Sequence, residues 1–256
     1  MKRDKGSWFE PEGEVFNKGF LNFFKKFFPH SGTIKQVDFI EKVLKLNKKM
    51  KILDLACGWG RHAIELGKRG YKVTGLDLNP LYLKVAKKES TKLKLTIDWV
   101  EGDIRKLPFK DDSFDVVYCL SNSFGYFQKE KEHQEVIKEV ARVLKPKGRF
   151  LLDFLPLEAL AFNFQKERKK EIGENCLLII KASFDFLKSR CYFEGTIIQG
   201  GKKRTINYDI RMFTIREILT LCQKFNLKFK KLYGFYSQKP FDFSSQRAIL
   251  IVQKIN

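Results

Sequence analysis

The fold is decided by residues 51–62, which read Lys51-Ile52-Leu53-Asp54-Leu55-Ala56-Cys57-Gly58-Trp59-Gly60-Arg61-His62. An apolar run with an acidic residue near its end passes through two closely spaced glycines and continues into an amphipathic segment. This order is typical of a strand, a tight loop and the beginning of a helix. The small residues let a ligand approach the backbone, and the first turn of a helix offers unpaired N–H groups. The stretch therefore predicts a ligand site at the end of a strand.

A second acidic residue stands at the end of the next predicted strand. Residues 71–76 form a mostly apolar run, and Asp77 follows them directly. A carboxylate in this place can accept hydrogen bonds from both hydroxyls of a ribose, as in dinucleotide-binding folds. The loop, however, lacks the third glycine of the pyrophosphate-binding pattern, and Asp54 would repel a phosphate but could accept a bond from an ammonium group. The pattern favours a nucleoside cofactor that carries an amino-acid tail.

The glycine-rich loop resembles the first motif of the class I S-adenosylmethionine-dependent methyltransferases, with Ala56 in place of the first glycine of that motif. Four later segments are similar to that family in the same order, from the ribose-binding motif and the adenine-binding segment to the fourth strand and the turn into the fifth. The resemblance is close over residues 34–155. The matching segments are residues 75–80, 101–109, 113–120 and 144–150.

The resemblance implies that S-adenosylmethionine is the cofactor. In this interpretation Asp77 accepts from the ribose, while the Asp103 carboxylate and the Ile104 amide hold the adenine. The cofactor-binding residues that it implies are Asp54, Ala56, Cys57, Gly58, Gly60, Arg61, Asp77, Leu78, Asp103, Ile104 and Leu120.

Strand and helix patterns alternate through most of the chain, which predicts an α/β fold with a doubly wound, mostly parallel sheet. By resemblance this is a seven-stranded Rossmann-like sheet of order 3-2-1-4-5-7-6, with the last strand antiparallel. We expect its core to comprise residues 31–160 and 213–256. The predicted strands are residues 51–56, 72–77, 94–100, 114–120, 148–155, 228–235 and 247–254, and the predicted helices are 33–46, 60–68, 80–89, 129–143 and 214–225.

Residues 161–212 follow a different pattern and predict a small antiparallel β insertion. Three runs rich in β-branched and aromatic residues are joined by turns, and Gly200-Gly201 is a two-residue hairpin signal. Thr214, with Glu217 three residues later, predicts a capping box where the chain returns to the core. The three predicted strands are residues 175–187, 190–199 and 203–213.

Residues 1–30 contain a cluster of aromatic residues with helical spacing, ended by Pro29. Three interpretations are open: an ordinary packed helix, a lid over the cofactor, or a membrane-surface anchor with Lys25 and Lys26 at the headgroups. We expect this helix and the insertion to form the roof of the active site, the helix being the mobile part. The aromatic residues with helical spacing are Phe16, Phe20, Phe23, Phe24 and Phe27, and we count Trp8 and Phe9 with them in the mobile part.

The segment after the fourth predicted strand carries the candidate substrate contacts. It lacks the Asn/Asp-Pro-Pro-Tyr/Phe signature of nucleic-acid amino methyltransferases and is similar to the corresponding loop of small-molecule N-methyltransferases. Ser121, Asn122 and Tyr126 are expected near the substrate, with Tyr236 and His30 at the mouth of the pocket.

His133 is expected to be exposed because charged residues surround it. No residue is assigned as catalytic, and no cluster has the spacing of a metal site. The function that follows is methyl transfer to a small molecule, at nitrogen or oxygen.

The charge of the chain leaves two other functions open. The net charge is +20, and more than half of the excess lies after residue 159. This could serve an RNA or protein methyltransferase that docks through its basic C-terminal third, although single lysines between apolar residues more often mark solvated faces. A non-catalytic regulator that binds the cofactor is the third alternative. With no run long enough to span a membrane and no secretory leader, we expect a cytoplasmic protein without a disulfide framework.

Overall fold

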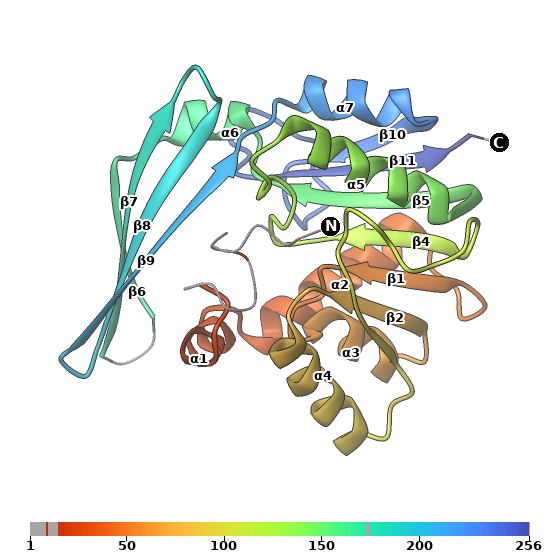
Figure 1. Cartoon of the computed structure of the whole chain (residues 1–256), viewed down its shortest axis with the longest axis horizontal. Coiled ribbons are helices and arrows are strands. Elements are labelled where there is room, and N and C mark those ends of the chain that lie inside the picture. The colour runs from red at the N-terminus through yellow and green to blue at the C-terminus, as the bar shows by residue number, and fades with distance from the viewer. Residues whose placement is uncertain (1–8, 10–14, 173–174, 256) are drawn as a thin grey trace.

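The computed structural model describes residue 9, residues 15–172 and residues 175–255. Its larger part is a seven-stranded sheet of order β10-β11-β5-β4-β1-β2-β3 (Figure 1). β11 runs antiparallel to both of its neighbours, and the other strands are parallel to one another. The predicted order with its antiparallel last strand is therefore confirmed. The strands are β1 (Lys51–Leu55), β2 (Lys72–Asp77), β3 (Asp98–Glu101), β4 (Phe114–Cys119), β5 (Leu144–Phe154), β10 (Leu227–Tyr233) and β11 (Ala248–Lys254).

Helices cover both faces of this sheet because successive side chains of each strand point to opposite faces. Ile52 of β1 belongs to an apolar cluster with α2 and α3, whereas the next residue, Leu53, belongs to a cluster with α5 and α7. β1 pairs with β2 on one side and with β4 on the other, so it lies in the interior of the sheet. The helices are α2 (His30–Leu44), α3 (Arg61–Lys68), α4 (Pro80–Lys92), α5 (Glu130–Val143) and α7 (Ile215–Lys224).

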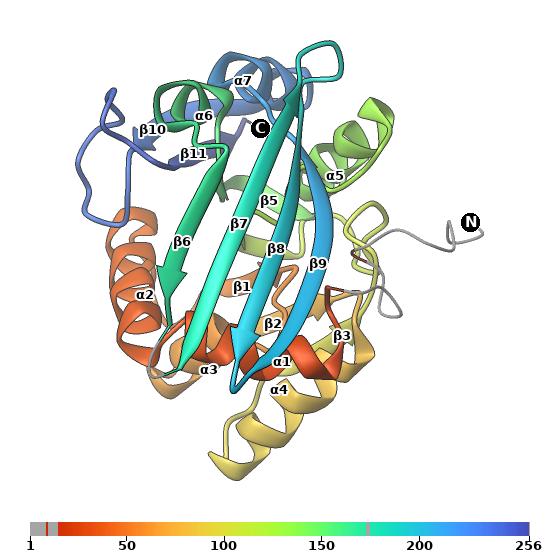
Figure 2. The same cartoon turned by 90° about the vertical axis from the view of Figure 1, so that its left-hand side faces the viewer.

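The insertion forms a separate antiparallel sheet of four strands, in the order β6-β7-β8-β9 (Figures 1 and 2). The expectation of three strands was wrong. β6 has the sequence Glu-Arg-Lys-Lys-Glu and all of its residues are exposed, so it shows no apolar alternation, and pairing with β7 alone makes it a strand. A short helix, α6 (Leu157–Asn163), which was also not expected, leads into this sheet. The strands are β6 (Glu167–Glu171), β7 (Cys176–Asp185), β8 (Arg190–Gln199) and β9 (Lys202–Arg211).

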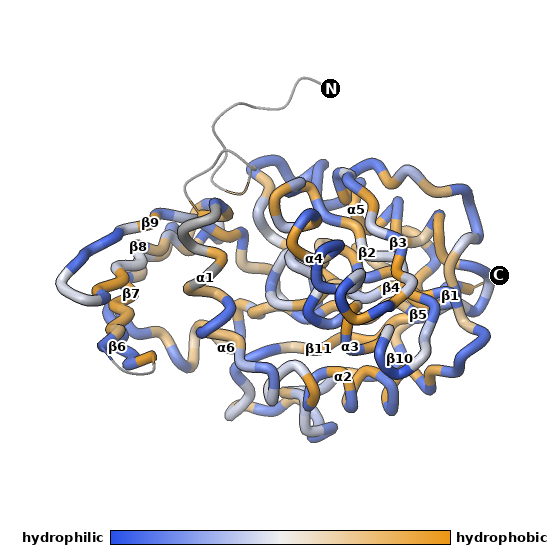
Figure 3. Tube along the Cα trace, turned by 90° about the horizontal axis from the view of Figure 1, so that it is seen from below, coloured by the Kyte–Doolittle hydropathy of each residue, from blue (hydrophilic) through white to orange (hydrophobic). Residues whose placement is uncertain are grey.

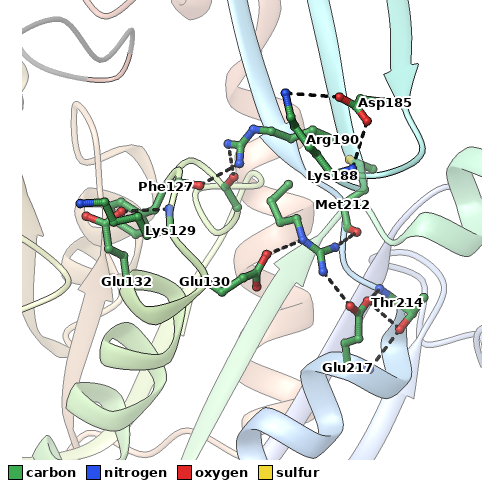
Figure 4. A network of polar contacts seen from close by, with 12 residues as sticks. Phe127, Lys129, Glu130, Glu132, Asp185, Lys188, Arg190, Met212, Thr214 and Glu217 are labelled. Carbon is green, nitrogen blue, oxygen red and sulfur yellow. Dashed lines mark hydrogen bonds and ion pairs between the residues drawn. The ribbon is translucent and has the colours of Figure 1, made fainter.

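Two arginines attach the small sheet to the large one (Figure 4). The guanidinium of Arg211, at the end of β9, pairs with Glu130 at 2.7 Å and with Glu217 at 2.7 Å. Glu217 also completes the predicted capping box, since its carboxylate accepts from the Thr214 amide at 2.7 Å. Arg190 is buried and donates to the carbonyl of Phe127 at 2.9 Å. Charge-assisted bonds of this kind are among the stronger ones, and they hold the small sheet in a defined position.

Helix α1 (Lys18–Phe27) lies between the small sheet and the large one, as Figures 1 and 2 show. Its described aromatic side chains belong to an apolar cluster with residues of β7, β8 and β9. The tip of the β8–β9 hairpin is hydrophilic in Figure 3, and the residues that contact α1, such as Leu178, Ile197 and Ile206, precede or follow that tip along the strands. Trp8 and the side chain of Phe20, which were expected in this cluster, lie outside the described residues. Within the described part of the chain, no helix combines the length and the apolar character needed to cross a bilayer.

His133 of α5 is buried, contrary to the expectation that it is exposed. Its ring packs against Phe124, Phe127 and Phe213 at centroid distances of 5.0–5.4 Å. The charged residues around it in sequence point outward because only one face of α5 meets the sheet. Burial, with the nearby Arg190 guanidinium, lowers the pKa of His133 to about 4.

This burial predicts a loss of stability in acid. Between pH 6.5 and 4 the unfolded chain protonates this histidine and the folded chain does not, so the free energy of unfolding should fall as the pH decreases through that window. The loss should be on the order of 3 kcal/mol. Denaturant titrations of His133→Leu should show a smaller loss of unfolding free energy between pH 6.5 and 4, by about the same 3 kcal/mol. The exposed His30 supplies the control variant His30→Leu, in which the acid-side loss should persist; an identical profile for wild type and His133→Leu would contradict the assignment.

Candidate active site

The loop after β1 has a backbone conformation that explains its sequence. Ala56, Gly58 and Gly60 all have positive φ, of 57°, 56° and 76°. This left-handed backbone conformation costs a non-glycine residue about 1–2 kcal/mol. Ala56 adopts it within the turn despite that cost. A Cβ on Gly60 would lie 2.3 Å from Cη2 of Trp99, so no larger residue fits where α3 begins. The turn therefore requires glycine at position 60 and favours glycine at position 58.

Asp77, at the end of β2, holds this loop with its carboxylate. Its Oδ2 accepts from the Gly58 amide at 2.7 Å, and its Oδ1 accepts from the Asn79 amide at 2.9 Å. Burial raises the pKa of Asp77, because the ionised form has lost water. Each carboxylate oxygen can accept a further bond, so the group can hold the loop and a ligand at the same time.

Asp54 is the second acid of the site, and it is 2% exposed. Its Oδ2 has no hydrogen-bonding partner among the described residues, although a buried polar atom normally has one. Burial raises the pKa of Asp54 to about 7. An unpartnered carboxylate oxygen on the wall of a cavity suits a ligand that donates hydrogen bonds and carries positive charge.

Arg61 lies beside Asp54 and connects three parts of the site. Its guanidinium donates to Ser121 Oγ at 2.9 Å and to Gln36 Oε1 at 2.6 Å. Gln36 Oε1 also lies 2.8 Å from Nε2 of His62. Burial lowers the pKa of the His62 imidazole well below its usual value, so the ring is neutral near pH 7. Burial also raises the pKa of the Cys57 thiol well above its usual range, which excludes it as a thiolate nucleophile.

Asp103 lines the cavity, and Arg105 engages its carboxylate. The Arg105 guanidinium donates to both of its oxygens at 2.6–3.0 Å and also pairs with Glu132. Asp103 and Ile104 both face the same cavity as Asp54 and Asp77. The guanidinium fixes the direction of the carboxylate while leaving oxygen lone pairs for another donor.

All these groups surround one cavity of about 360 Å³, within the size range of small-molecule sites. Gly60 is the only predicted cofactor residue that does not line it, since it supports the loop from behind by its packing against Trp99. The predicted cofactor residues on its wall are Asp54, Ala56, Cys57, Gly58, Arg61, Asp77, Leu78, Asp103, Ile104 and Leu120.

Of the predicted substrate contacts, Ser121, Asn122 and Tyr126 line the cavity, whereas Tyr236 and His30 do not. The Tyr236 hydroxyl instead donates to the buried carboxylate of Asp153 at 2.6 Å, which turns it away from the cavity. The His30 side chain is 63% exposed, and its Nε2 lies 3.9 Å from a Glu65 oxygen. Both residues had been placed by their position along the chain, which does not determine where a loop side chain points.

Several lining residues were not singled out in the sequence. Asn79 and Tyr82 come from the beginning of α4, which follows directly after the acid of β2. Another group comes from the strands of the insertion, where the alternation of residues along each strand was the available signal. Those from the small sheet are Leu178, Ile180, Gly195, Ile206, Tyr208 and Ile210.

A row of aromatic contacts closes the cavity on the side of the N-terminal segment. Phe16 meets Tyr82 edge to face at 6.0 Å, and Phe24 lies parallel to Trp59 at 6.5 Å. The Asn79 amide group also donates to the Phe16 carbonyl at 2.7 Å. The segment is thus joined mainly by ring contacts, each worth about 0.5–1.5 kcal/mol beyond the area that it buries. In the described part of the chain, no three His, Cys, Asp or Glu side chains are grouped closely enough to hold a metal ion.

Comparisons with known proteins agree with this architecture. Residues 52–148 match the family model described as a methyltransferase domain. A demethylmenaquinone methyltransferase from Deinococcus radiodurans is 38% identical over 41% of this chain and 44% of that protein. The chain spans about half the length of this and similar curated relatives. Cypemycin N-terminal methyltransferase from a Streptomyces species is 26% identical over 79% of this chain and 82% of that protein.

Among solved structures, the CcbJ methyltransferase from Streptomyces caelestis superposes with a TM-score of 0.81 at 17% identity, and the match covers 99% of this chain and 100% of that one. This likeness concerns the fold. The family match concerns the segment from β1 to the beginning of β5, which carries the glycine-rich loop and both acidic strand ends. The segment from β1 to the beginning of β5 is therefore similar to a methyltransferase domain, and the chain shares the fold of the superposed methyltransferase.

Proposed function

We propose that this protein binds S-adenosylmethionine in the cavity and transfers its methyl group to nitrogen or oxygen of a small molecule. The observation that carries the proposal is a pair of carboxylates, the buried Asp54 and the half-buried Asp77, on either side of the glycine-rich loop. The matching relatives, whose names describe methyltransferases of a quinone and of a peptide N-terminus, agree with this activity and leave the acceptor open.

Each acid suits a different part of the cofactor. The Asp77 carboxylate, held by two backbone amides, is placed to accept from a ribose diol. The unpartnered Oδ2 of Asp54 suits the ammonium of the methionine tail, and a cation there would offset the cost of burying this charge. Asp103, directed by Arg105, would accept from the exocyclic amine of adenine, with the Ile104 amide donating to the ring.

When bound, S-adenosylmethionine supplies an electrophilic methyl group whose bond to sulfur breaks as the acceptor forms its own bond to that carbon. The protein's part is to hold the acceptor in line and to exclude water, which together can supply several kcal/mol. Ser121, Asn122 and Tyr126 line the cavity on the loop after β4 and would orient the acceptor. Burial raises the pKa of Tyr126, which keeps its hydroxyl protonated and able to donate.

The aromatic N-terminal segment would act as a lid. Phe16, Phe23 and Phe24 line the cavity, and Phe24 lies against Trp59 of the glycine-rich loop. The N-terminal segment that includes α1 contacts the rest of the protein mainly through packed aromatic rings, among the residues that the structure describes. Such an element can open at a modest cost, and it could admit the acceptor and then close over it.

A nucleic-acid acceptor is less well supported by the placement of the basic residues. Many of the exposed lysines of the C-terminal third lie on β6 and β9, the two edge strands of the small sheet, and on β10 at the far edge of the large sheet (Figure 1), while others are spread over β7, α7 and the loops. They therefore do not form one continuous basic surface beside the cavity, which binding to a phosphate backbone would favour.

The first prediction concerns cofactor affinity. Asp77→Ala should weaken binding of S-adenosylmethionine about 30-fold, because charge-assisted bonds to the ribose are lost at roughly 2 kcal/mol. Isothermal titration calorimetry measures this directly. Asp98→Ala removes an exposed acid at the beginning of the neighbouring strand β3 and should bind the cofactor as wild type does. Equal affinity of Asp77→Ala and Asp98→Ala would show that Asp77 does not hold the ribose.

The second prediction concerns the lid. Binding of S-adenosylhomocysteine should slow amide hydrogen exchange in α1 several-fold, because a filled cavity supports the rings that hold this helix. Exchange in α7, from which no residue lines the cavity, should stay the same and serves as the internal control. Exchange in α1 that is indifferent to the cofactor would rule out its role as a lid over this site.

A further inference from the structure

We infer that the methyl acceptor is an apolar, largely aromatic molecule whose body lies against the inner face of β7, β8 and β9, in a notch left by Gly195. This inference rests on the proposed function and adds the chemical class of the acceptor to it. It is carried by three observations: the composition of that face, the position of its glycine, and the distribution of polar groups around the cavity.

The inner face of the small sheet is a continuous apolar wall. Leu178 and Ile180 of β7 point into the cavity, as do Ile206, Tyr208 and Ile210 of β9. They alternate with residues of the opposite face, as a strand requires. The rings of α1 pack against this same face and also line the cavity, so a molecule in this chamber would lie among apolar groups.

Gly195 interrupts this wall in the middle of β8. It pairs with Ile180 on one side and with Ile206 on the other, so every neighbour in its row has a large side chain. Its φ is not positive, and the backbone therefore does not require glycine there. A Cβ would lie 3.2 Å from Cγ1 and 3.5 Å from Cδ1 of Ile206, so a larger residue would require the Ile206 side chain to shift by a few tenths of an ångström, while no backbone atom lies closer than 4.0 Å. Glycine within a strand lowers stability, and one that lines a cavity marks a close approach by a ligand.

Most polar groups of the cavity come from the ends of β1 and β2 and from the segments that follow β1, β2, β3 and β4, where the cofactor and the transferred methyl group would be held. Among the described lining residues of α1 and the small sheet, the Tyr208 hydroxyl is the one polar side-chain group. An aminosugar placed here would leave several hydroxyls without partners, at about 1–3 kcal/mol each. An aromatic body would instead gain about 25 cal/mol for each Å² of apolar surface buried.

The reaction this implies uses no other reagent. A lone pair on the acceptor oxygen or nitrogen forms a bond to the methyl carbon, and the bond from carbon to sulfur breaks with its electron pair left on sulfur. The products are the methylated acceptor, S-adenosylhomocysteine and one proton, which is released to solvent. The aromatic body would place the heteroatom toward Ser121 and Asn122 while its remainder fills the notch.

The test compares an apolar probe with a polar one in wild type and two matched variants. Gly195→Leu fills the notch. Glu194→Leu is its control, because it adds leucine to the neighbouring position of β8, where the side chain is exposed and points away from the notch. Binding of 2-naphthol and of glucosamine is measured by calorimetry, with and without saturating S-adenosylhomocysteine. Gly195→Ala is a milder third variant, and melting temperatures confirm that each variant is folded.

The expected result is that wild type and Glu194→Leu bind 2-naphthol and give no heat with glucosamine. Gly195→Leu should bind 2-naphthol at least about 10-fold more weakly, with Gly195→Ala between the two, while all variants bind S-adenosylhomocysteine equally. Binding of glucosamine in preference to 2-naphthol, or equal binding of 2-naphthol by wild type and Gly195→Leu, would overturn the inference. Loss of S-adenosylhomocysteine binding in wild type would contradict the proposed function instead, so the two failures are distinguishable.

Discussion

Every part of the site depends on the way the loop after β1 is tied to the end of β2. The Asp77 carboxylate accepts from the Gly58 amide, and the Cys57 amide donates to the Leu76 carbonyl at 2.9 Å. These bonds hold a loop in which three residues have positive φ, and they bring the beginning of α3 to the end of two neighbouring strands. The carboxyl ends of parallel strands meet at one edge of the sheet, so loops from β3 and β4 arrive at the same place. A ligand site follows from the topology once this loop is held.

The electrostatics of the site favour a cationic ligand. Burial raises the pKa of both Asp54 and Asp77, which means that the folded protein holds their ionised forms at a cost. A positive charge in the cavity would offset part of that cost, and the apolar walls would strengthen the attraction because they exclude water. The same walls would weaken the hydration of a sulfonium, and its charge disperses as methyl transfer proceeds. Affinity for the cofactor and reactivity of its methyl group would thus have one physical cause.

The two sheets contribute different parts of the cavity. The large sheet supplies the polar loops, and the small sheet supplies an apolar wall that faces them across the cavity. Arg190 and Arg211 fasten that wall to α5, to α7 and to the loop after β4, whereas α1 is held chiefly by ring contacts. A fixed wall and a more loosely attached helix suit a site that must define the position of the acceptor and also admit it.

Local patterns in the sequence determined the sheet and its binding loop. Residues 51–62 and Asp77 predicted the strand, turn and acid arrangement because the turn geometry excludes most other residues. Only the tertiary structure decided features that depend on contacts between distant segments. β6 is a strand because β7 pairs with it, and His133 is buried because α5 turns that face to the sheet. The sequence alone shows Gly195 only as a glycine within a strand. Its place in the cavity wall depends on neighbouring strands, because they define the space beside it.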